Sequence, residues 1–178
     1  MTLIELMVTL SLVAILATLA VPSFNGALAS NRLSSATTEV YTALVQAKSE
    51  AVRRGKRVTV CASANGSTCS NNPDGWNTGW ITFVDTTRTS GLNLDSGEDV
   101  IAVGQAVSDS ISIRGPTYFS FSADSRSRDM NGGFLAATLR ICSTSPALDD
   151  SKRSKEITTA VSGRLNVLPK PGVGVNCP

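Results

Sequence analysis

No histidine occurs among the 178 residues of the chain, and this absence excludes several kinds of active site. A Ser–His–Asp or Cys–His nucleophile needs an imidazole, and so does a His-ligated metal or haem. Aromatic residues make up only 5% of the chain, too few for a surface on which single-stranded nucleic acid stacks. The 16 basic and 14 acidic residues leave a formal net charge of +2, without the strong basic bias typical of nucleic-acid binders.

Charge is also missing from the first part of the chain, because no residue between Glu5 and Arg32 is charged. The segment Leu6–Val21 is apolar apart from two threonines and one serine, whose hydroxyls can bond back to helix carbonyls. As a helix, the neutral stretch is ~39 Å long, which exceeds the ~30 Å hydrocarbon core of a bilayer.

Three ordinary interpretations of this segment fit poorly. A secretory signal peptide has a basic front, whereas the only charged side chain before the apolar run is Glu5. A soluble core helix has a polar face, which Leu6–Val21 lacks. An ordinary membrane anchor rarely begins with a carboxylate, because a desolvated one costs several kcal/mol. We therefore interpret the segment as a helix that lies in a membrane and later packs against copies of itself.

The presence of Glu5 and of Pro22 in this helix can each be explained locally. Thr2 and Glu5 fit a capping box, and a carboxylate in the first turn suits the helix dipole. The cap does not explain why an apolar segment follows, so an additional role for Glu5 stays open. Pro22 removes the amide that would bond to the carbonyl of Thr18, which permits a kink or local melting.

The chain becomes amphipathic after this segment and then changes to strands. Apolar residues recur at helical spacing at Leu33, Val40, Leu44, Ala47 and Ala51. Because Gly55 is a natural residue to follow a helix, we predict one helix from about Leu3 to Arg54, ~78 Å long. Alternating segments predict strands at 57–61, 80–84, 110–113, 118–121, 135–142, 156–161 and 165–167, with polar loops at 71–78, 86–97 and 143–155. The fold class is α+β, with antiparallel sheets against the helix.

The N-terminus, read as Met1-Thr2-Leu3-Ile4-Glu5-Leu6-Met7-Val8 and followed by the apolar helix and Pro22, resembles a mature type IV pilin or pseudopilin after cleavage by prepilin peptidase. Phe is the usual first residue of such chains, so Met1 is a departure. The resemblance implies that Glu5 neutralises the amine of Met1 in a neighbouring subunit during assembly and that this amine is methylated. It also implies that the helix before Pro22 unwinds in a filament.

Further motifs are similar to the FimT/FimU and GspH branch of these proteins. They are residues 47–54 at the end of the helix, Gly75–Asp85 with its two tryptophans, and Gly163-Arg164-Leu165. The resemblance implies a pilin-like fold with two disulfides, divided into a hydrophobic helix at 1–28 and a globular domain at 29–178. That domain consists of an amphipathic helix at 29–54 and β-sheets at 55–178.

The implied function is that of a structural subunit of a type IV pilus, with other pilin subunits as partners. Before assembly it would be a single-pass inner-membrane protein with a periplasmic domain, handled by prepilin peptidase and the pilus assembly machinery. Afterwards it would form part of an extracellular filament. The alternatives are a type II secretion pseudopilin of the GspH type and a DNA-binding minor pilin for natural transformation. We expect no enzyme activity, cofactor or metal.

The four cysteines allow three disulfide pairings. Cys61 and Cys69 enclose Asn65-Gly66, a hairpin-turn dipeptide, so a bridge between them is geometrically easy. Cys142 would then pair with Cys177. A zinc site is not favoured, because the spacing of Cys61 and Cys69 differs from the usual C-x2-4-C.

A few charged residues bear on DNA binding and on calcium binding. DNA-binding FimT-like pilins carry a C-terminal G-R-x-R, but this chain has Asn166 in place of the second arginine. A patch of Arg164, Lys152, Arg153 and Lys170 would attract phosphate, but Asp149, Asp150 and Glu156 balance it, so DNA is not the favoured partner. The oxygen-bearing side chains of Asn93, Asp95, Glu98 and Asp99 lack the calcium-loop spacing, and this segment is interpreted as a solvated acidic loop. Trp76 and Trp80 are interpreted as core residues.

Overall fold

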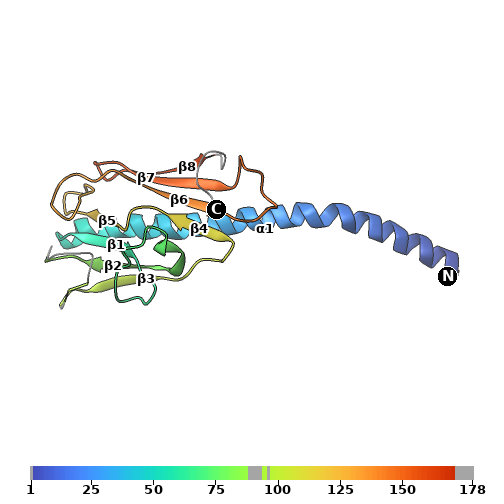
Figure 1. Ribbon diagram of the computed structural model, residues 1–178, viewed down its shortest axis with the longest axis horizontal. Coiled ribbons are helices and arrows are strands. Elements are labelled where there is room, and N and C mark those ends of the chain that lie inside the picture. Colours follow the sequence, from blue (N-terminus) through green and yellow to red (C-terminus); the bar gives the residue numbers. More distant parts are fainter. Residues whose placement is uncertain (1, 88–93, 96, 171–178) are drawn as a thin grey trace.

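One long helix and two antiparallel sheets form the chain (Figure 1). The computed structural model describes residues 2–87, 94–95 and 97–170, with the side chains of residues 17–23 left out. Helix α1 spans Leu3–Arg54, as predicted, and is continuous through Pro22. It ends where Gly55 adopts a left-handed conformation with φ 63°, from which its amide bonds back to the last turn.

Eight strands follow the helix, arranged in two four-stranded sheets. The first sheet has the order β3-β2-β1-β5 and the second the order β4-β6-β7-β8. Every neighbouring pair is antiparallel. The strands are β1 (Val58–Ala62), β2 (Trp80–Val84), β3 (Val100–Gly104), β4 (Ile111–Arg114), β5 (Tyr118–Phe121), β6 (Ala137–Ser143), β7 (Ser154–Thr159) and β8 (Leu165–Lys170), with a 3-10 turn η1 (Gly75–Thr78) before β2.

The C-terminal half of α1 packs between the two sheets, and its N-terminal half projects beyond them (Figure 1). The predicted apolar face of the helix is fully buried, since Leu33, Val40, Leu44, Ala47 and Ala51 are at most 1% exposed. It meets apolar residues of both sheets, among them Val60, Phe119, Phe121, Leu139, Ile141 and Ile157. This shared core confirms the predicted α+β arrangement of sheets against a helix.

Two details of the strand prediction were wrong. Strand β3 was missed because Val100–Gly104 is a short apolar run without alternation. Strand β7 begins at Ser154, inside the predicted loop 143–155, because its register with β6 pairs Ser154 with Cys142. The predicted loop 71–78 also contains the 3-10 turn η1.

The two tryptophans and one disulfide fix the loop between β1 and β2. Trp76 is fully buried, packs edge-to-face against Phe119, and donates its indole N–H to the carbonyl of Pro116 at 2.8 Å. The core interpretation of both tryptophans is confirmed, since Trp80 is also buried. A disulfide joins Cys61 to Cys69, with 5.5 Å between their Cα atoms. Cys142 is buried in β6, and its predicted partner Cys177 lies outside the described residues.

In the described part of the chain, from which the side chains of residues 17–23 are left out, no helix is long and apolar enough to cross a membrane.

Candidate functional site

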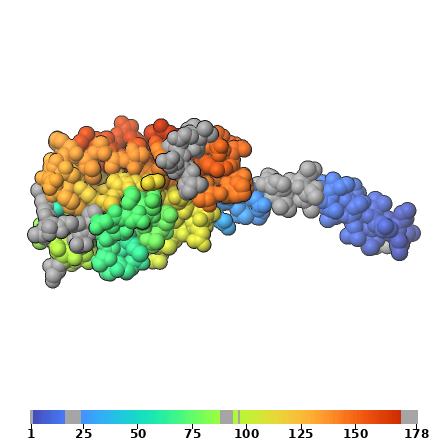
Figure 2. Space-filling view, viewed as in Figure 1, coloured from blue at the N-terminus to red at the C-terminus, as the bar shows by residue number. Residues whose placement is uncertain are grey.

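The largest exposed apolar surface of the described residues lies on the projecting half of α1. Every residue from Thr2 to Leu16 is exposed, and Leu3 reaches 78%. Figure 2 shows this segment standing clear of the globular part. Its large apolar side chains are Leu3, Ile4, Leu6, Met7, Val8, Leu10, Leu12, Val13, Ile15 and Leu16. A contiguous apolar surface of this extent is typical of a contact with a protein or a membrane.

The first turn of α1 forms the predicted capping box. The amide of Thr2 donates to Oε2 of Glu5 at 3.3 Å, and the amide of Glu5 donates to Oγ1 of Thr2 at 3.4 Å. Both bonds satisfy donors that a helix start would otherwise leave free. The Glu5 carboxylate remains exposed, so the cap leaves it accessible to a second group. Met1 lies outside the described residues, and its pairing with Glu5 stays a prediction.

The hydroxyl groups on this apolar surface are bonded within the helix. Thr9 donates to the carbonyl of Leu6 at 2.9 Å, and Ser11 donates to the carbonyl of Val8 at 2.8 Å. Since these donors are satisfied, burial of the surface leaves neither of them without a partner.

The four basic residues of the DNA-binding hypothesis lie at opposite ends of the β7–β8 hairpin. Lys170 pairs with Ser154 at one end, beside Lys152 and Arg153, whereas Arg164 lies at the other end in the turn before Leu165. Strand β8 separates the two ends by ~17 Å at about 3.3 Å per residue. The predicted four-residue patch therefore does not form as one surface.

Acidic neighbours reduce the positive charge at the first of these ends. Nε of Arg153 lies 3.0 Å from Oδ1 of Asp150, and Nζ of Lys170 lies 3.9 Å from Oε2 of Glu156. Glu156 also receives two bonds from the guanidinium of Arg140. These pairs agree with the expectation that acids balance this loop.

The turn Gly163-Arg164-Leu165 packs closely on a neighbouring loop and is bonded to α1. Gly163 has a φ of 72°, and a Cβ on it would lie 1.9 Å from the carbonyl oxygen of Ser125. Its own carbonyl accepts a hydrogen bond from Nζ of Lys48 in α1 at 2.8 Å. Any larger residue would therefore separate the β7–β8 turn from the loop beneath it.

A second basic group near Arg164 was not foreseen from the sequence. The guanidinium carbons of Arg126 and Arg128 lie 5.6 and 4.7 Å from the ring centre of Phe134, which is exposed. Asp124 pairs with both arginines, so these charges are also balanced. Alternation in the sequence gives no signal for this group, because Asp124 lies in a turn in which Ser125 adopts a φ of 67°.

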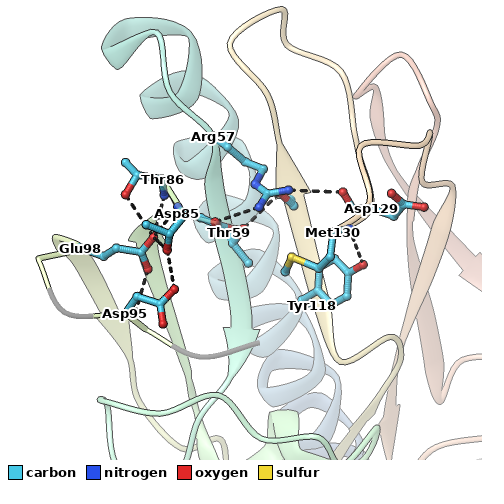
Figure 3. Close-up of polar contacts among 11 residues, drawn as sticks. Arg57, Thr59, Asp85, Thr86, Asp95, Glu98, Tyr118, Asp129 and Met130 are labelled. Carbon is cyan, nitrogen blue, oxygen red and sulfur yellow. Dashed lines mark hydrogen bonds and ion pairs between the residues drawn. The ribbon is translucent and has the colours of Figure 1, made fainter. Parts of the chain in front are cut away.

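The acidic loop before β3 is organised by hydrogen bonds, not by metal-ligand geometry. The carboxylate of Glu98 accepts from the amides of Thr86, Thr87 and Asp95 at 2.6, 3.2 and 3.0 Å (Figure 3). Thr87 also donates its hydroxyl to Asp95. Among the described residues no group of His, Cys, Asp or Glu is arranged to hold a metal ion. Asn93, which the calcium hypothesis included, lies outside them.

Comparison with known proteins gives one family and one fold. The model of the family described as Type II transport protein GspH matches residues 36–163 of this chain. A search of the curated proteins found no match.

Three solved structures are similar to this chain at low sequence identity. The type IV minor pilin FimU of Pseudomonas aeruginosa, in two crystal forms, is 17% identical to this chain with TM-scores of 0.55 and 0.52. The matches cover 78% and 76% of this chain and 90% and 92% of FimU. The minor pseudopilin EpsH from the Type 2 Secretion System of Vibrio cholerae is 13% identical, with a TM-score of 0.47, over 76% of this chain and 94% of EpsH. The likeness to FimU confirms the predicted pilin-like fold.

Proposed function

The chain belongs to the family described as Type II transport protein GspH, and on that premise we propose that it is a structural subunit of a type IV pilus, of the FimT/FimU type. The observation that carries the proposal is the exposed apolar half of α1. A large apolar side chain contributes roughly 1.5–3 kcal/mol when it is fully buried. Leu3–Leu16 presents a whole row of such side chains to solvent in the single chain, and a bundle of parallel copies would bury them.

Glu5 is the residue that would set the register of this bundle. A carboxylate buried in an apolar bundle needs a partner, because an unpaired charge there costs several kcal/mol. The nearest cation of a parallel neighbour is the amine of Met1. We infer that the Glu5 of an incoming subunit pairs with the Met1 amine of the subunit assembled before it, and that Pro22 is where the helix can unwind during this step.

The remaining parts of the proposal concern processing and location. The segment 1–28 anchors the subunit in the inner membrane before assembly, and the domain 29–178 lies in the periplasm. Prepilin peptidase processes the precursor, the N-terminal amine is methylated, and the assembly machinery moves the subunit into a surface filament. The subunit acts by packing, without an enzyme activity or a cofactor.

A second candidate function is favoured by the description of the family itself. The GspH family is described as a type II transport protein, which supports a subunit of a secretion pseudopilus. The driving force for assembly is the same in both machines, because both would bury the apolar half of α1 in a parallel bundle. The two functions differ in where the filament ends, at the cell surface or within the envelope.

Mass spectrometry of filaments sheared from the cell surface separates these functions. A pilus subunit is expected in the sheared fraction, together with other pilins, and in amounts that depend on the assembly machinery. Absence from that fraction, with the protein retained in the cell envelope, would contradict the pilus proposal and favour the secretion pseudopilus. Deletion of the type II secretion machinery serves as the control, because it should not change the sheared fraction if the pilus proposal is correct.

A further inference from the structure

The two tryptophans differ in how their indole N–H groups are satisfied. Trp76 donates its N–H to the carbonyl of Pro116 at 2.8 Å. Trp80 is only 5% exposed, yet its N–H has no acceptor among the residues that the structure describes. Nearly all polar groups so deeply buried in folded proteins are bonded to protein or to water, because an unsatisfied donor is costly. The N–H of Trp80 therefore marks a position for an acceptor that the chain itself does not supply.

Gly104 leaves this edge of the indole uncovered. It pairs with Trp80 across β2 and β3, and a Cβ on Gly104 would overlap Cε2 and Nε1 of the indole. Any residue with a side chain would therefore displace the ring. Because the β3 backbone approaches so closely without a side chain, the indole edge remains at the surface of a groove, which both residues line.

The groove lies between α1 and β3 and has a volume of about 740 Å³. This volume falls within the roughly 300–1,000 Å³ of typical small-molecule sites. Besides the indole, the apolar part of its lining consists of Ala43 and Ala102, whose side chains are small. The space beside the indole therefore remains open to a ligand.

The wall that α1 contributes to the groove is polar and almost uncharged. It includes the hydroxyls of Ser35, Thr38 and Thr42, which lie on one face of the helix at spacings of three and four residues. Thr37, on the buried face, bonds back to the carbonyl of Leu33, whereas within the described chain these three hydroxyls form no such bond. Among the described residues that line the groove, Glu39 alone is charged. The wall is therefore suited to a ligand that exchanges many neutral hydrogen bonds.

We propose that this groove binds a neutral saccharide, one of whose oxygens accepts the N–H of Trp80. A sugar ring has an apolar C–H face, which matches the indole, Ala43 and Ala102, and a rim of hydroxyl groups, which matches the polar wall of α1. The saccharide oxygen replaces the water that bonds the indole in the free chain. The inference goes beyond the proposed function and does not depend on it.

The lining disfavours ligands of other chemistry. An anion would meet the carboxylate of Glu39 without any cation in the described lining to offset it. A lipid chain would cover the hydroxyls of Ser35, Thr38 and Thr42 without bonding to them. A peptide would pair with the free backbone edge of β3, whereas the unsatisfied N–H and the hydroxyls line the groove beside that edge.

The indole N–H signals of the whole chain test this inference directly. The chain has two tryptophans, so ¹⁵N labelling of tryptophan gives two indole signals, which Trp76→Phe assigns. The protein is held in micelles of a detergent without a sugar headgroup. Maltotriose, cellotriose and diacetylchitobiose are then added in turn, each to about 10 mM, because exchange of water bonds for sugar bonds gives affinities near 1 mM.

At least one of these saccharides should move the Trp80 signal to a plateau. The Trp76 signal should stay in place, because its N–H is already bonded to Pro116. Trigalacturonate, an anionic counterpart of similar size, should bind at least about tenfold more weakly, since it meets Glu39.

A matched pair of variants in β3 locates the binding. Ala102→Leu places a larger side chain in the groove and should weaken binding by more than about tenfold. Val103→Leu is the control, because the next residue of a strand points to the opposite face, and it should bind as the parent does. Unchanged urea unfolding midpoints show that both variants keep the fold.

Four results would overturn the inference. They are a Trp80 signal that none of the three saccharides moves, parental affinity in Ala102→Leu, binding of trigalacturonate as tight as that of the neutral saccharides, and a shift caused by a valine-rich pentapeptide but by no saccharide. The last result would make the groove a peptide site instead.

Discussion

The guanidinium of Arg57 and the carboxylate of Asp85 form a buried ion pair, with Nη2 and Oδ1 2.9 Å apart and their side chains 6% and 8% exposed. Asp85 also accepts a hydrogen bond from the hydroxyl of Thr59 at 2.8 Å, and Arg57 donates to the carbonyl of Asp129 at 3.4 Å (Figure 3). Arg57 precedes β1, and Asp85 follows β2. The pair therefore ties the adjacent ends of two strands to the loop after β5.

Replacement of Asp85 by alanine should strongly destabilise the chain. The change leaves the Arg57 guanidinium buried without its carboxylate, which costs about 3–5 kcal/mol. Urea unfolding of the whole chain measures the loss. The matched control is Asp74→Ala, which breaks the exposed pair with Arg114 and should cost at most ~1 kcal/mol. Equal losses in the two variants would contradict this prediction.

Acid should weaken the fold partly through Glu50. The hydrogen bonds from Arg53 and then Arg54 lower the pKa of Glu50 from 4.5 to about 2. Since the folded pKa is the lower one, the stabilisation is complete above pH 4.5 and disappears as the pH falls towards 2. Glu50→Gln should therefore be less stable than the parent at pH 7, and the difference in unfolding midpoint should vanish near pH 2. A difference that is constant with pH would refute this explanation.

The disulfide between Cys61 and Cys69 should contribute about 2.6 kcal/mol by closing a short loop. Cys61→Ala with Cys69→Ala is expected to lower the free energy of unfolding by this amount. The predicted bridge between Cys142 and Cys177 closes a longer loop and should contribute about 3.8 kcal/mol. Peptide mapping without reductant checks both pairings, and a Cys61–Cys142 peptide would show that they are wrong.

Duplex DNA should bind only weakly at physiological salt. Arg164 is separated from Lys152, Arg153 and Lys170 by the length of the β7–β8 hairpin. A DNA backbone would therefore meet two small positive groups, and Asp150 and Glu156 partly neutralise the group that contains Arg153 and Lys170. Titration of labelled duplex at about 0.15 M salt measures the affinity. Micromolar or tighter binding that is lost in Arg164→Ala would overturn this expectation and favour the DNA-uptake function.

The sequence predicted the helix better than the strands, for physical reasons. The capping box of Thr2 and Glu5 and the left-handed Gly55 are local signals, and both ends of α1 were correct. Strands Trp80–Val84 and Tyr118–Phe121 were also correct, because alternation with flanking turn residues is equally local. Strands β3 and β7 depend on their partners across the sheet, which alternation along the chain does not reveal.

Sites that depend on distant contacts were harder to predict. Lys152 and Arg164 are close in sequence, but the β7–β8 hairpin places them at opposite ends. Arg126 and Arg128 approach Phe134 only through the folding of the loop between them. The family resemblance, by contrast, was readable from the N-terminal motif and from Gly75–Asp85, and the match of the family model confirms it.

The incorporation of Glu5→Ala into sheared filaments tests the central claim most directly. The variant should fold and reach the membrane normally, because Glu5 is exposed and belongs to the first turn of α1, at the end that projects beyond the core (Figure 1). In filaments the Met1 amine of its neighbour would be buried without a partner, at a cost of several kcal/mol. We expect incorporation to fall by more than about tenfold, with a smaller fall for Glu5→Asp. Incorporation of Glu5→Ala at the level of the parent chain would contradict the account and leave Glu5 as a helix cap alone.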